Sequence, residues 1–206
     1  SDIVALAASK VLVRLENETL SIGERILAQG LQLTIRGQEK IGIIGPNGVG
    51  KSTLLAKLHQ LLSNKREISL GFMPQDYKKT LQLELSPVEF LSQTGHKEEI
   101  QKIQSHLASL NFSYPEMHHQ IHSLSGGQQG KLLLLNLVLR KPNFLLLDEP
   151  TRNFSPTSQP EIRKLFANFP GGLVTVSHDR RFLKEVCTTI YRLTEHGLEV
   201  VDLQDL

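Results

Sequence analysis

The chain has little of several features that would assign it to a special class of protein. Cys187 is the only cysteine among the 206 residues, so an internal disulfide and a metal site built from cysteines are both excluded. The sequence has 23 basic and 21 acidic residues, and this small net charge does not by itself require a nucleic-acid or membrane partner. The longest apolar stretch, from Leu132 to Leu139, is interrupted by Asn136 and is too short to span a bilayer.

No secretory signal peptide is visible, and the single cysteine suits a reducing compartment. We therefore expect a cytoplasmic protein without direct insertion into a membrane. The sequence begins at Ser1 rather than at a methionine, and we expect it to be a piece of a longer protein. A chain of this length can bury a sizeable core, as one large domain or as two small subdomains.

Strand and helix patterns alternate along most of the chain and predict an α/β fold. Residues 10–40 show the two-residue alternation of short strands. The apolar run 40–44 leads into a glycine, as a buried parallel strand entering a loop does, and a helix is expected from Ser52 to about Leu62. The segments 144–147 (Phe-Leu-Leu-Leu) and 173–176 (Leu-Val-Thr-Val) predict further buried strands. This alternation implies a parallel sheet covered by helices.

The segment 86–140 has a different pattern and is predicted to be a short, mostly helical insert. Ser86 begins a capping box that has proline at the first helical position. Apolar residues then repeat at helical spacing from Ile100 to Leu110. Beyond the insert, Asp179 is expected to begin a helix, and residues 190–201 are expected to form a hairpin.

A glycine-rich segment after the strand at 40–44 predicts a phosphate-binding loop. It matches the pattern G-x-x-x-x-G-K-[ST] between the strand and the helix that this pattern requires. Glycines let successive backbone N–H groups face a phosphate, and the following helix adds its positive end. Lys51 is expected to bridge the β- and γ-phosphates of a nucleotide, and Ser52 to bind Mg²⁺. The residues expected to bind the nucleotide here are Gly45, Pro46, Asn47, Gly48, Val49, Gly50, Lys51, Ser52 and Thr53.

Four more polar residues are expected around the same nucleotide. Asp148 and Glu149 follow an apolar strand, at the edge of the sheet where open α/β folds bind ligands. Asp148 is expected to hold Mg²⁺, and Glu149 to orient and polarise the attacking water. His178 ends another strand on this edge and is expected to bind the γ-phosphate and to hold the water and Glu149 in register. Gln75 is expected to reach the Mg²⁺ or the water.

The pentapeptide Leu124-Ser125-Gly126-Gly127-Gln128 lies between the phosphate loop and the acidic pair. At average amino-acid usage it should occur by chance in fewer than about one in a thousand chains of this length. Ser125, Gly126 and Gly127 open a helix, which makes a second anion site, and with Gln128 they are expected to bind nucleotide. Two such sites can grip one γ-phosphate only if the second comes from a facing copy. The sequence therefore predicts a nucleotide-sandwich dimer.

Two other groups of residues are given a plainer interpretation. His118, His119 and His122 have the loose spacing of a solvated loop and lack a fourth ligand for a metal site. Lys78 and Lys79 are expected to be solvated surface. Neither group is expected to take part in the chemistry.

Taken together, the motifs resemble the nucleotide-binding domain of the ATP-binding cassette (ABC) superfamily over nearly the whole chain. The resemblance implies ATP and Mg²⁺ as ligands, and an ATPase that is slow as an isolated domain. It also implies a P-loop NTPase core with an N-terminal antiparallel β subdomain. On this basis residues 1–206 form a single nucleotide-binding domain. Its β subdomain is 1–40, its core is 41–85 with 141–206, and its helical signature subdomain is 86–140.

Within the superfamily, the segment 177–182 (Ser-His-Asp-Arg-Arg-Phe) and the short insert resemble the ABC-F group. The segment 147–156 is similar to the second cassette of the branch that confers antibiotic resistance. ABC-F proteins carry two cassettes in one chain, lack a membrane domain and act on ribosomes. The resemblance therefore implies a second ABC domain and the ribosome as partners. A small antibiotic is not expected to bind this domain directly.

Three features depart from the superfamily pattern. An aromatic residue that stacks on adenine usually precedes the loop lysine, and Ile22 stands at that place. An aspartate that couples two sites usually follows the acidic pair, and Ser155-Pro156 stands there. The chain also holds a single cassette. These departures bear on base stacking, on coupling between sites and on the rate of hydrolysis.

The sequence leaves three functions open. The leading hypothesis is an ATPase module of an ABC-F translation or antibiotic-resistance factor, in which ATP binding closes two cassettes on a ribosome. One alternative is the nucleotide-binding subunit of a membrane transporter, which would dock its transmembrane partner near Gln75. The other is a non-hydrolysing ATP-dependent binding module, which Ile22 and Ser155-Pro156 favour and which the intact Lys51, Glu149 and His178 disfavour.

Overall fold

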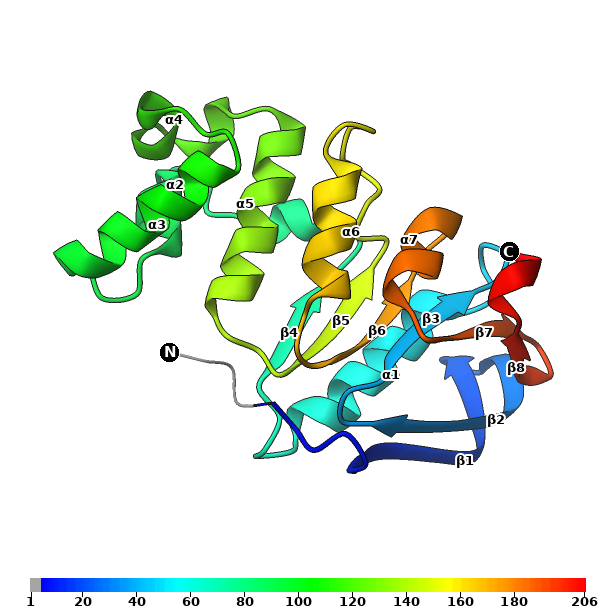
Figure 1. Cartoon of the computed structure of the whole chain (residues 1–206). Helices are drawn as coiled ribbons and strands as arrows, with labels where there is room; N and C mark the ends of the chain where they lie inside the picture. Colours follow the sequence, from blue (N-terminus) through cyan, green and yellow to red (C-terminus); the bar gives the residue numbers. More distant parts are fainter. Residues whose placement is uncertain (1–4) are drawn as a thin grey trace. The chain divides into compact units, whose positions relative to one another are not determined.

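The computed structural model describes residues 5–206, which form two compact units (Figure 1). The first, here called the sheet unit, runs from the first described residues to Gln75 and includes Lys141–Arg152 and Pro156–Leu206. The second, the helical unit, comprises Asp76–Arg140 and Asn153–Ser155. The first four positions of the predicted β subdomain lie outside the described residues. Each unit is described by itself.

The sheet unit is built on a six-stranded sheet in the order β4-β5-β6-β3-β7-β8. Neighbouring strands are parallel except β7 and β8, which form the predicted antiparallel hairpin. The α/β class and the parallel sheet expected from the sequence are therefore confirmed. The strands are β3 (Lys40–Ile44), β4 (Leu70–Met73), β5 (Phe144–Asp148), β6 (Gly172–Val176), β7 (Thr189–Thr194) and β8 (Gly197–Val201).

The register of the central strands determines where the polar residues after them lie. Every residue of β5 and of β6 is buried, which explains why both strands are mostly apolar and show no alternation of polar and apolar residues. Asp148 pairs with Val176 at the carboxyl ends of these strands. The residues that follow, Glu149 on one strand and His178 on the other, therefore leave the sheet at the same edge.

An antiparallel hairpin of β1 (Val11–Ile22) and β2 (Arg25–Arg36) precedes the sheet. Each strand has 12 residues, so the prediction of short strands was wrong in length. The pairing has four register shifts, and each one moves the following side chains to the other face of the strand. The two-residue alternation is interrupted for this reason, and only fragments of it are visible in the sequence.

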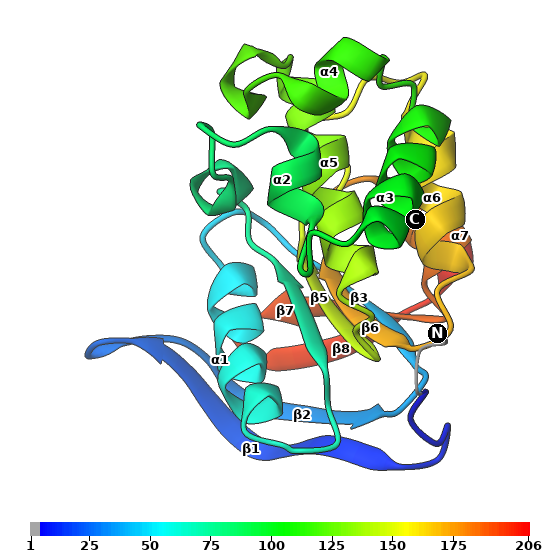
Figure 2. The ribbon, with the colours of Figure 1, turned by 90° about the vertical axis from the view of Figure 1, so that its left-hand side faces the viewer.

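Helix α1 (Lys51–Ser63) packs between this hairpin and the sheet (Figures 1 and 2). Four leucines at helical spacing face inward and join the core of the sheet unit, namely Leu54, Leu55, Leu58 and Leu62. Helices α6 (Gln159–Ala167) and α7 (Arg180–Val186) pack on each other. Asp179 caps α7 as predicted, since its carboxylate accepts a hydrogen bond of 3.0 Å from the Phe182 N–H.

The helical unit contains α2 (Pro87–Leu91), α3 (Lys97–Ser109), α4 (Tyr114–His118) and α5 (Gly126–Leu139). Three of these helices begin with a capping box, at Ser86, Ser113 and Ser125. Each box satisfies backbone donors that a helix start leaves without a partner. Among the described residues, no helix is long and apolar enough to cross a membrane.

Asn143 ties the start of β5 to the segment before β4. Its side-chain oxygen accepts a hydrogen bond of 2.8 Å from the Ser69 N–H, and its amide nitrogen donates one of 2.9 Å to the Glu67 carbonyl. The side chain is 6% exposed. We expect Asn143→Ala to lower the free energy of unfolding by about 1–3 kcal/mol, because the two hydrogen bonds that this buried side chain makes to backbone groups are lost. Urea unfolding monitored by circular dichroism measures this loss, and a change within about 0.5 kcal/mol would contradict it.

Candidate functional site

The predicted phosphate loop connects β3 to α1 and is shaped by glycines. Gly50 precedes α1 with φ of 110°, in the left-handed region that glycine adopts most easily. A side chain at this position would also be strained sterically, because a Cβ would lie 2.9 Å from a Leu20 methyl group. Gly50 makes no side-chain cap, so the first N–H groups of α1 are left for a ligand. This is the arrangement of a phosphate-binding helix start.

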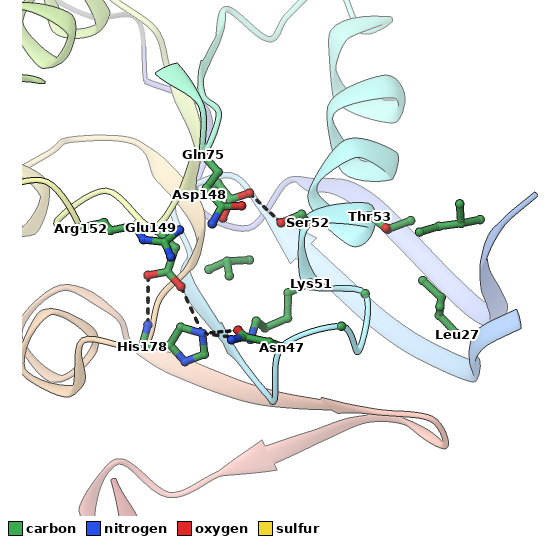
Figure 3. A pocket seen from close by; sticks show the side chains of 14 residues that line it. Leu27, Asn47, Lys51, Ser52, Thr53, Gln75, Asp148, Glu149, Arg152 and His178 are labelled. Carbon is green, nitrogen blue, oxygen red and sulfur yellow. Dashed lines mark hydrogen bonds and ion pairs between the residues drawn. The ribbon is translucent and has the colours of Figure 1, made fainter. Parts of the chain in front are cut away.

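A cavity of about 360 Å³ opens beside this loop (Figure 3). Its lining residues all belong to the sheet unit. Gly45, Pro46 and Val49 belong to the loop but do not line the cavity. Ten of the residues predicted for the site do line it: Asn47, Gly48, Gly50, Lys51, Ser52, Thr53, Gln75, Asp148, Glu149 and His178.

The ammonium group of Lys51 is held by the carbonyl groups of the loop. Its Nζ donates to the Gly45 carbonyl and, at 3.3 Å, to the Pro46 carbonyl. Lys51 is 7% exposed, and burial lowers its pKa, while the nearby charges of Glu149 and Asp148 act in the opposite direction. An anion in the cavity would therefore meet a cation that is already fixed beside it.

Ser52 and Asp148 form an oxygen-rich pair on neighbouring elements. The Ser52 hydroxyl donates a hydrogen bond of 2.9 Å to the Asp148 carboxylate, and Gln75 lines the same cavity. Burial raises the pKa of Asp148, and the Ser52 hydrogen bond and the charges of Lys51 and Arg152 reduce that rise. Nearby cations offset only part of the cost of burying this carboxylate. Together with the hydroxyl of Ser52 and the amide of Gln75, it offers the oxygen ligands that a hard cation such as Mg²⁺ prefers.

Glu149 and His178 meet across the edge of the sheet (Figure 3). One Glu149 oxygen accepts a hydrogen bond of 3.3 Å from the His178 backbone N–H, and the other lies 3.3 Å from His178 Nε2. The same nitrogen lies 3.2 Å from Asn47 Oδ1 and 3.3 Å from Lys51 Nζ. The imidazole is thus placed between the carboxylate and the phosphate loop.

The backbone of Glu149 has φ of 53°, which is unusual for a residue with a side chain. A hydrogen bond of 2.8 Å from its N–H to the Val176 carbonyl holds this conformation. Strained backbone of this kind clusters at functional sites. Here it turns the chain after Asp148, so that two consecutive carboxylates both line the cavity.

Three residues that line the cavity were not identified from the sequence as site residues: Arg152, Leu27 and Val176, the last of which was predicted only as part of a buried strand. Arg152 stands three positions after Glu149, and that proximity to the strand end was the available signal. Leu27 lies in the middle of an apolar strand pattern, which carries no functional signal by itself. Ile22 also lines the cavity, although the sequence presented it only as a departure from a family pattern.

In the helical unit, Ser125 begins α5 through a capping box. Its hydroxyl accepts a hydrogen bond of 3.2 Å from the Gln128 N–H, and the Gln128 side-chain oxygen accepts one of 3.1 Å from the Ser125 N–H. A Cβ at Gly126 would meet only Lys78 Nζ, at 3.7 Å, and a Cβ at Gly127 would meet nothing within 4 Å. The predicted helix start is confirmed, and its binding of an anion stays a prediction.

His118, His122 and Lys79, which were given a plainer interpretation, make local contacts within the helical unit. His118 Nε2 lies 3.2 Å from the Gln104 amide nitrogen, and His122 Nε2 lies 2.7 Å from the Gln120 side-chain oxygen. Lys79 forms an ion pair of 3.2 Å with Asp76. Over residues 5–206, no three or more His, Cys, Asp or Glu side chains are grouped closely enough to hold a metal ion.

Replacing Asp148 by asparagine tests the electrostatics of the site. Because the folded chain raises the pKa of this carboxyl, the folded state binds the proton more tightly than the unfolded state. The carboxylate therefore costs stability that grows as the pH rises above its unfolded pKa. We expect Asp148→Asn to raise the melting temperature at pH 7 by about 1–4 °C, and the gain to shrink near pH 4. Thermal unfolding at both pH values measures it, and a lower melting temperature at pH 7 would contradict it.

Comparison with known proteins identifies the family of the chain. The sequence pattern of the family described as ABC transporter matches residues 28–152. The protein named probable ATP-binding protein YheS, from Escherichia coli K12, is 30% identical over 93% of this chain and 31% of its own length. The Arabidopsis thaliana protein named ABC transporter F family member 2 is 28% identical over 93% of this chain and 29% of its own length. The chain thus spans about three-tenths of these curated relatives.

A solved structure shows the same fold. The dimeric, post-hydrolysis structure of the ATP-binding cassette MJ0796, bound to ADP and Pi, has a TM-score of 0.75 and 21% sequence identity. The match covers 92% of this chain and 98% of that one. It confirms the predicted fold, a P-loop NTPase core with an N-terminal antiparallel β pair and a short helical insert. With the match of the family pattern to well over half of its residues, the chain belongs to the ABC transporter family and is an ATP-binding cassette of that family.

Proposed function

We propose that this cassette hydrolyses ATP to ADP and phosphate. One observation carries the proposal: the Glu149 carboxylate, held by His178, lines the same cavity as Lys51 and the start of α1. A base and a phosphate-binding loop in one cavity are the two parts that attack of water on a phosphate requires. A module that only bound ATP would need the loop and not the base.

In this mechanism the phosphates of ATP occupy the loop, and Lys51 binds the β- and γ-phosphates. When ATP binds, Nζ replaces its hydrogen bonds to the carbonyl groups of Gly45 and Pro46 by hydrogen bonds to phosphate oxygens. The residues that would hold Mg²⁺ are Ser52, Asp148 and Gln75, and the bound ion would supply positive charge next to the phosphates. Donors and cations that are already in place lower the activation barrier of hydrolysis, because they do not have to reorganise as negative charge develops on the phosphate oxygens.

Glu149 accepts the proton of the attacking water, and His178 holds that carboxylate and the γ-phosphate in register. The two contacts between these residues fix the orientation of the carboxylate. General-base assistance of this type contributes about 10²- to 10⁴-fold to a rate. The strained backbone of Glu149 serves this orientation.

A second ABC domain completes the site in the proposed mechanism. Ser125, Gly126 and Gly127 present an open helix start in the helical unit, and a facing cassette would bring its equivalent to the γ-phosphate. The structure of MJ0796 is a dimer of cassettes, which supports pairing of this kind. Turnover by this chain alone is therefore slow and depends on its association.

We further propose that the cassette belongs to an ABC-F protein and that its closure on ATP acts on the ribosome, in translation or in antibiotic resistance. The Arabidopsis relative named ABC transporter F family member 2 supports this, as does the similarity of residues 177–182 to that group. The competing function is the nucleotide-binding subunit of a membrane transporter.

Co-sedimentation distinguishes the two functions. The full-length protein that carries this cassette is prepared with Glu149→Gln and with the corresponding base of its other cassette neutralised, so that the closed state accumulates. It is centrifuged with ATP, separately against purified ribosomes and against washed membranes. We expect ATP-dependent pelleting with ribosomes. Pelleting with membranes alone would assign the cassette to a transporter.

A further inference from the structure

The proposed mechanism leaves one cation of the cavity unused, Arg152. Of the lysines and arginines among the described residues, only Lys51 and Arg152 line the cavity. Both belong to the sheet unit, as does the rest of the lining. Arg152 is exposed, and within residues 5–206 its guanidinium forms no ion pair with a carboxylate. This cation is therefore open to an anionic ligand.

The backbone that carries Arg152 is anchored on the sheet unit. Its N–H donates a hydrogen bond of 3.2 Å to the Glu149 carbonyl. The preceding residue, Thr151, is 4% exposed, and its hydroxyl donates a hydrogen bond of 3.0 Å to the Asp179 carboxylate. The Arg152 side chain thus starts from a turn whose position next to Glu149 is fixed by the fold.

Arg152 lies at the end of the cavity where the terminal phosphate is expected. In the view of Figure 3 its side chain lies beside Glu149, on the side opposite to Leu27. Burial raises the pKa of Asp148, and the charge of Arg152 is among those that reduce this rise. In the proposed mechanism Glu149 holds the water next to the γ-phosphate. Of the three phosphates, the γ-phosphate is therefore the one nearest to Arg152.

The charge of the cavity favours a second cation at this end. Asp148 and Glu149 both line the cavity, and their carboxylates repel the phosphates of an incoming nucleotide. Lys51 offsets only one of these two negative charges. A guanidinium always carries its charge, and two of its N–H groups match two oxygens of one phosphate. Arg152 therefore has both the charge and the shape that a γ-phosphate requires.

We propose that Arg152 binds the γ-phosphate of ATP within its own cassette and stabilises the charge that develops there during hydrolysis. This rests on the proposed function, because it takes the phosphates to lie in the loop and Glu149 to be the base. In the reaction a water oxygen bonds to the γ-phosphorus, and the proton of that water passes to Glu149. The bond from the γ-phosphorus to the bridging oxygen breaks, and its electron pair stays with ADP. Arg152 forms no covalent bond and offsets charge on the γ-phosphate oxygens.

The test compares ADP with the non-hydrolysable imido analogue of ATP, because ADP lacks the γ-phosphate. Each is titrated into the whole chain with Mg²⁺ in a calorimeter. Arg152→Gln should weaken the binding of the ATP analogue by about 10- to 100-fold and that of ADP by less than about 3-fold. Arg152→Lys keeps the charge and should weaken the ATP analogue less than Arg152→Gln does. Phosphate release at saturating ATP should fall by about 10²- to 10³-fold in Arg152→Gln.

Arg66→Gln is the matched control. Arg66 is exposed and does not line the cavity, so this variant loses the same charge and should change neither dissociation constant. If Arg152→Gln weakens both nucleotides equally, or weakens neither, Arg152 does not bind the γ-phosphate and the proposal is overturned.

Failure of the proposed function gives a different result. If the unmodified chain binds neither nucleotide, the nucleotide site itself fails, and the role of Arg152 fails with it. If the unmodified chain binds both nucleotides without releasing phosphate from ATP at any concentration of the chain, hydrolysis fails. The ratio of the two dissociation constants then still decides whether Arg152 binds the γ-phosphate.

Discussion

Glu149→Gln should reduce the release of phosphate from ATP by about 10²- to 10⁴-fold while ATP binding is retained. The glutamine keeps the shape of the side chain and removes its ability to accept a proton. Lys51, Ser52 and the start of α1 are unchanged, so the contacts expected for the phosphates remain. Because closed cassettes reopen only after hydrolysis in the proposed mechanism, the variant should also accumulate as an ATP-bound closed dimer.

A coupled phosphate assay measures the rate, and gel filtration with ATP detects the dimer. Glu199→Gln provides the control, because Glu199 is an exposed carboxylate on β8 that does not line the cavity. It should hydrolyse ATP at the rate of the unmodified chain. If Glu149→Gln also keeps that rate, Glu149 is not the base, and the proposed mechanism is wrong.

Lys51→Ala should weaken ATP binding by about 10²- to 10⁴-fold. A lysine that donates charge-assisted hydrogen bonds to two phosphates contributes about 1.5–3 kcal/mol for each bond, and about 1.4 kcal/mol corresponds to a factor of ten. Burial lowers the pKa of this lysine, which means that the fold carries its charge at a cost. The alanine variant should therefore stay folded, and circular dichroism can verify this.

Lys57→Ala is the matched control for this variant. Lys57 lies on the same helix and forms an ion pair of 3.1 Å with Glu18, and it does not line the cavity. Titration should show unchanged ATP affinity for Lys57→Ala. Unchanged affinity for Lys51→Ala would mean that the glycine-rich loop does not bind the phosphates.

The parts of the fold and site that the sequence predicts are those encoded by short segments. The glycines of the loop from Gly45 to Thr53 indicate its conformation, and the buried strands β5 and β6 are mostly apolar. In a parallel sheet the carboxyl ends of all the strands lie at the same edge. For this reason the convergence of Lys51, Asp148, Glu149 and His178 on one cavity was predictable from their positions alone.

Other features depend on pairing between distant segments and left no local signal. The register shifts in the hairpin of β1 and β2 interrupt the alternation of buried and exposed residues, so the length of its strands could not be predicted from the sequence. Leu27 reaches the cavity because it packs on Gly50, a contact between two elements of the fold that neither sequence segment shows. Arg152 reaches it through the turn after Glu149, where the backbone adopts an uncommon conformation.

In the proposed mechanism, this cassette hydrolyses ATP in a site that a second cassette completes. The most direct measurement is the rate of phosphate release per chain as the concentration of the chain increases at saturating ATP. We expect a low rate per chain that rises with concentration, and no release above background from Glu149→Gln at any concentration. A brisk rate per chain that does not depend on concentration would contradict the claim, since it would show that a single cassette is a complete enzyme.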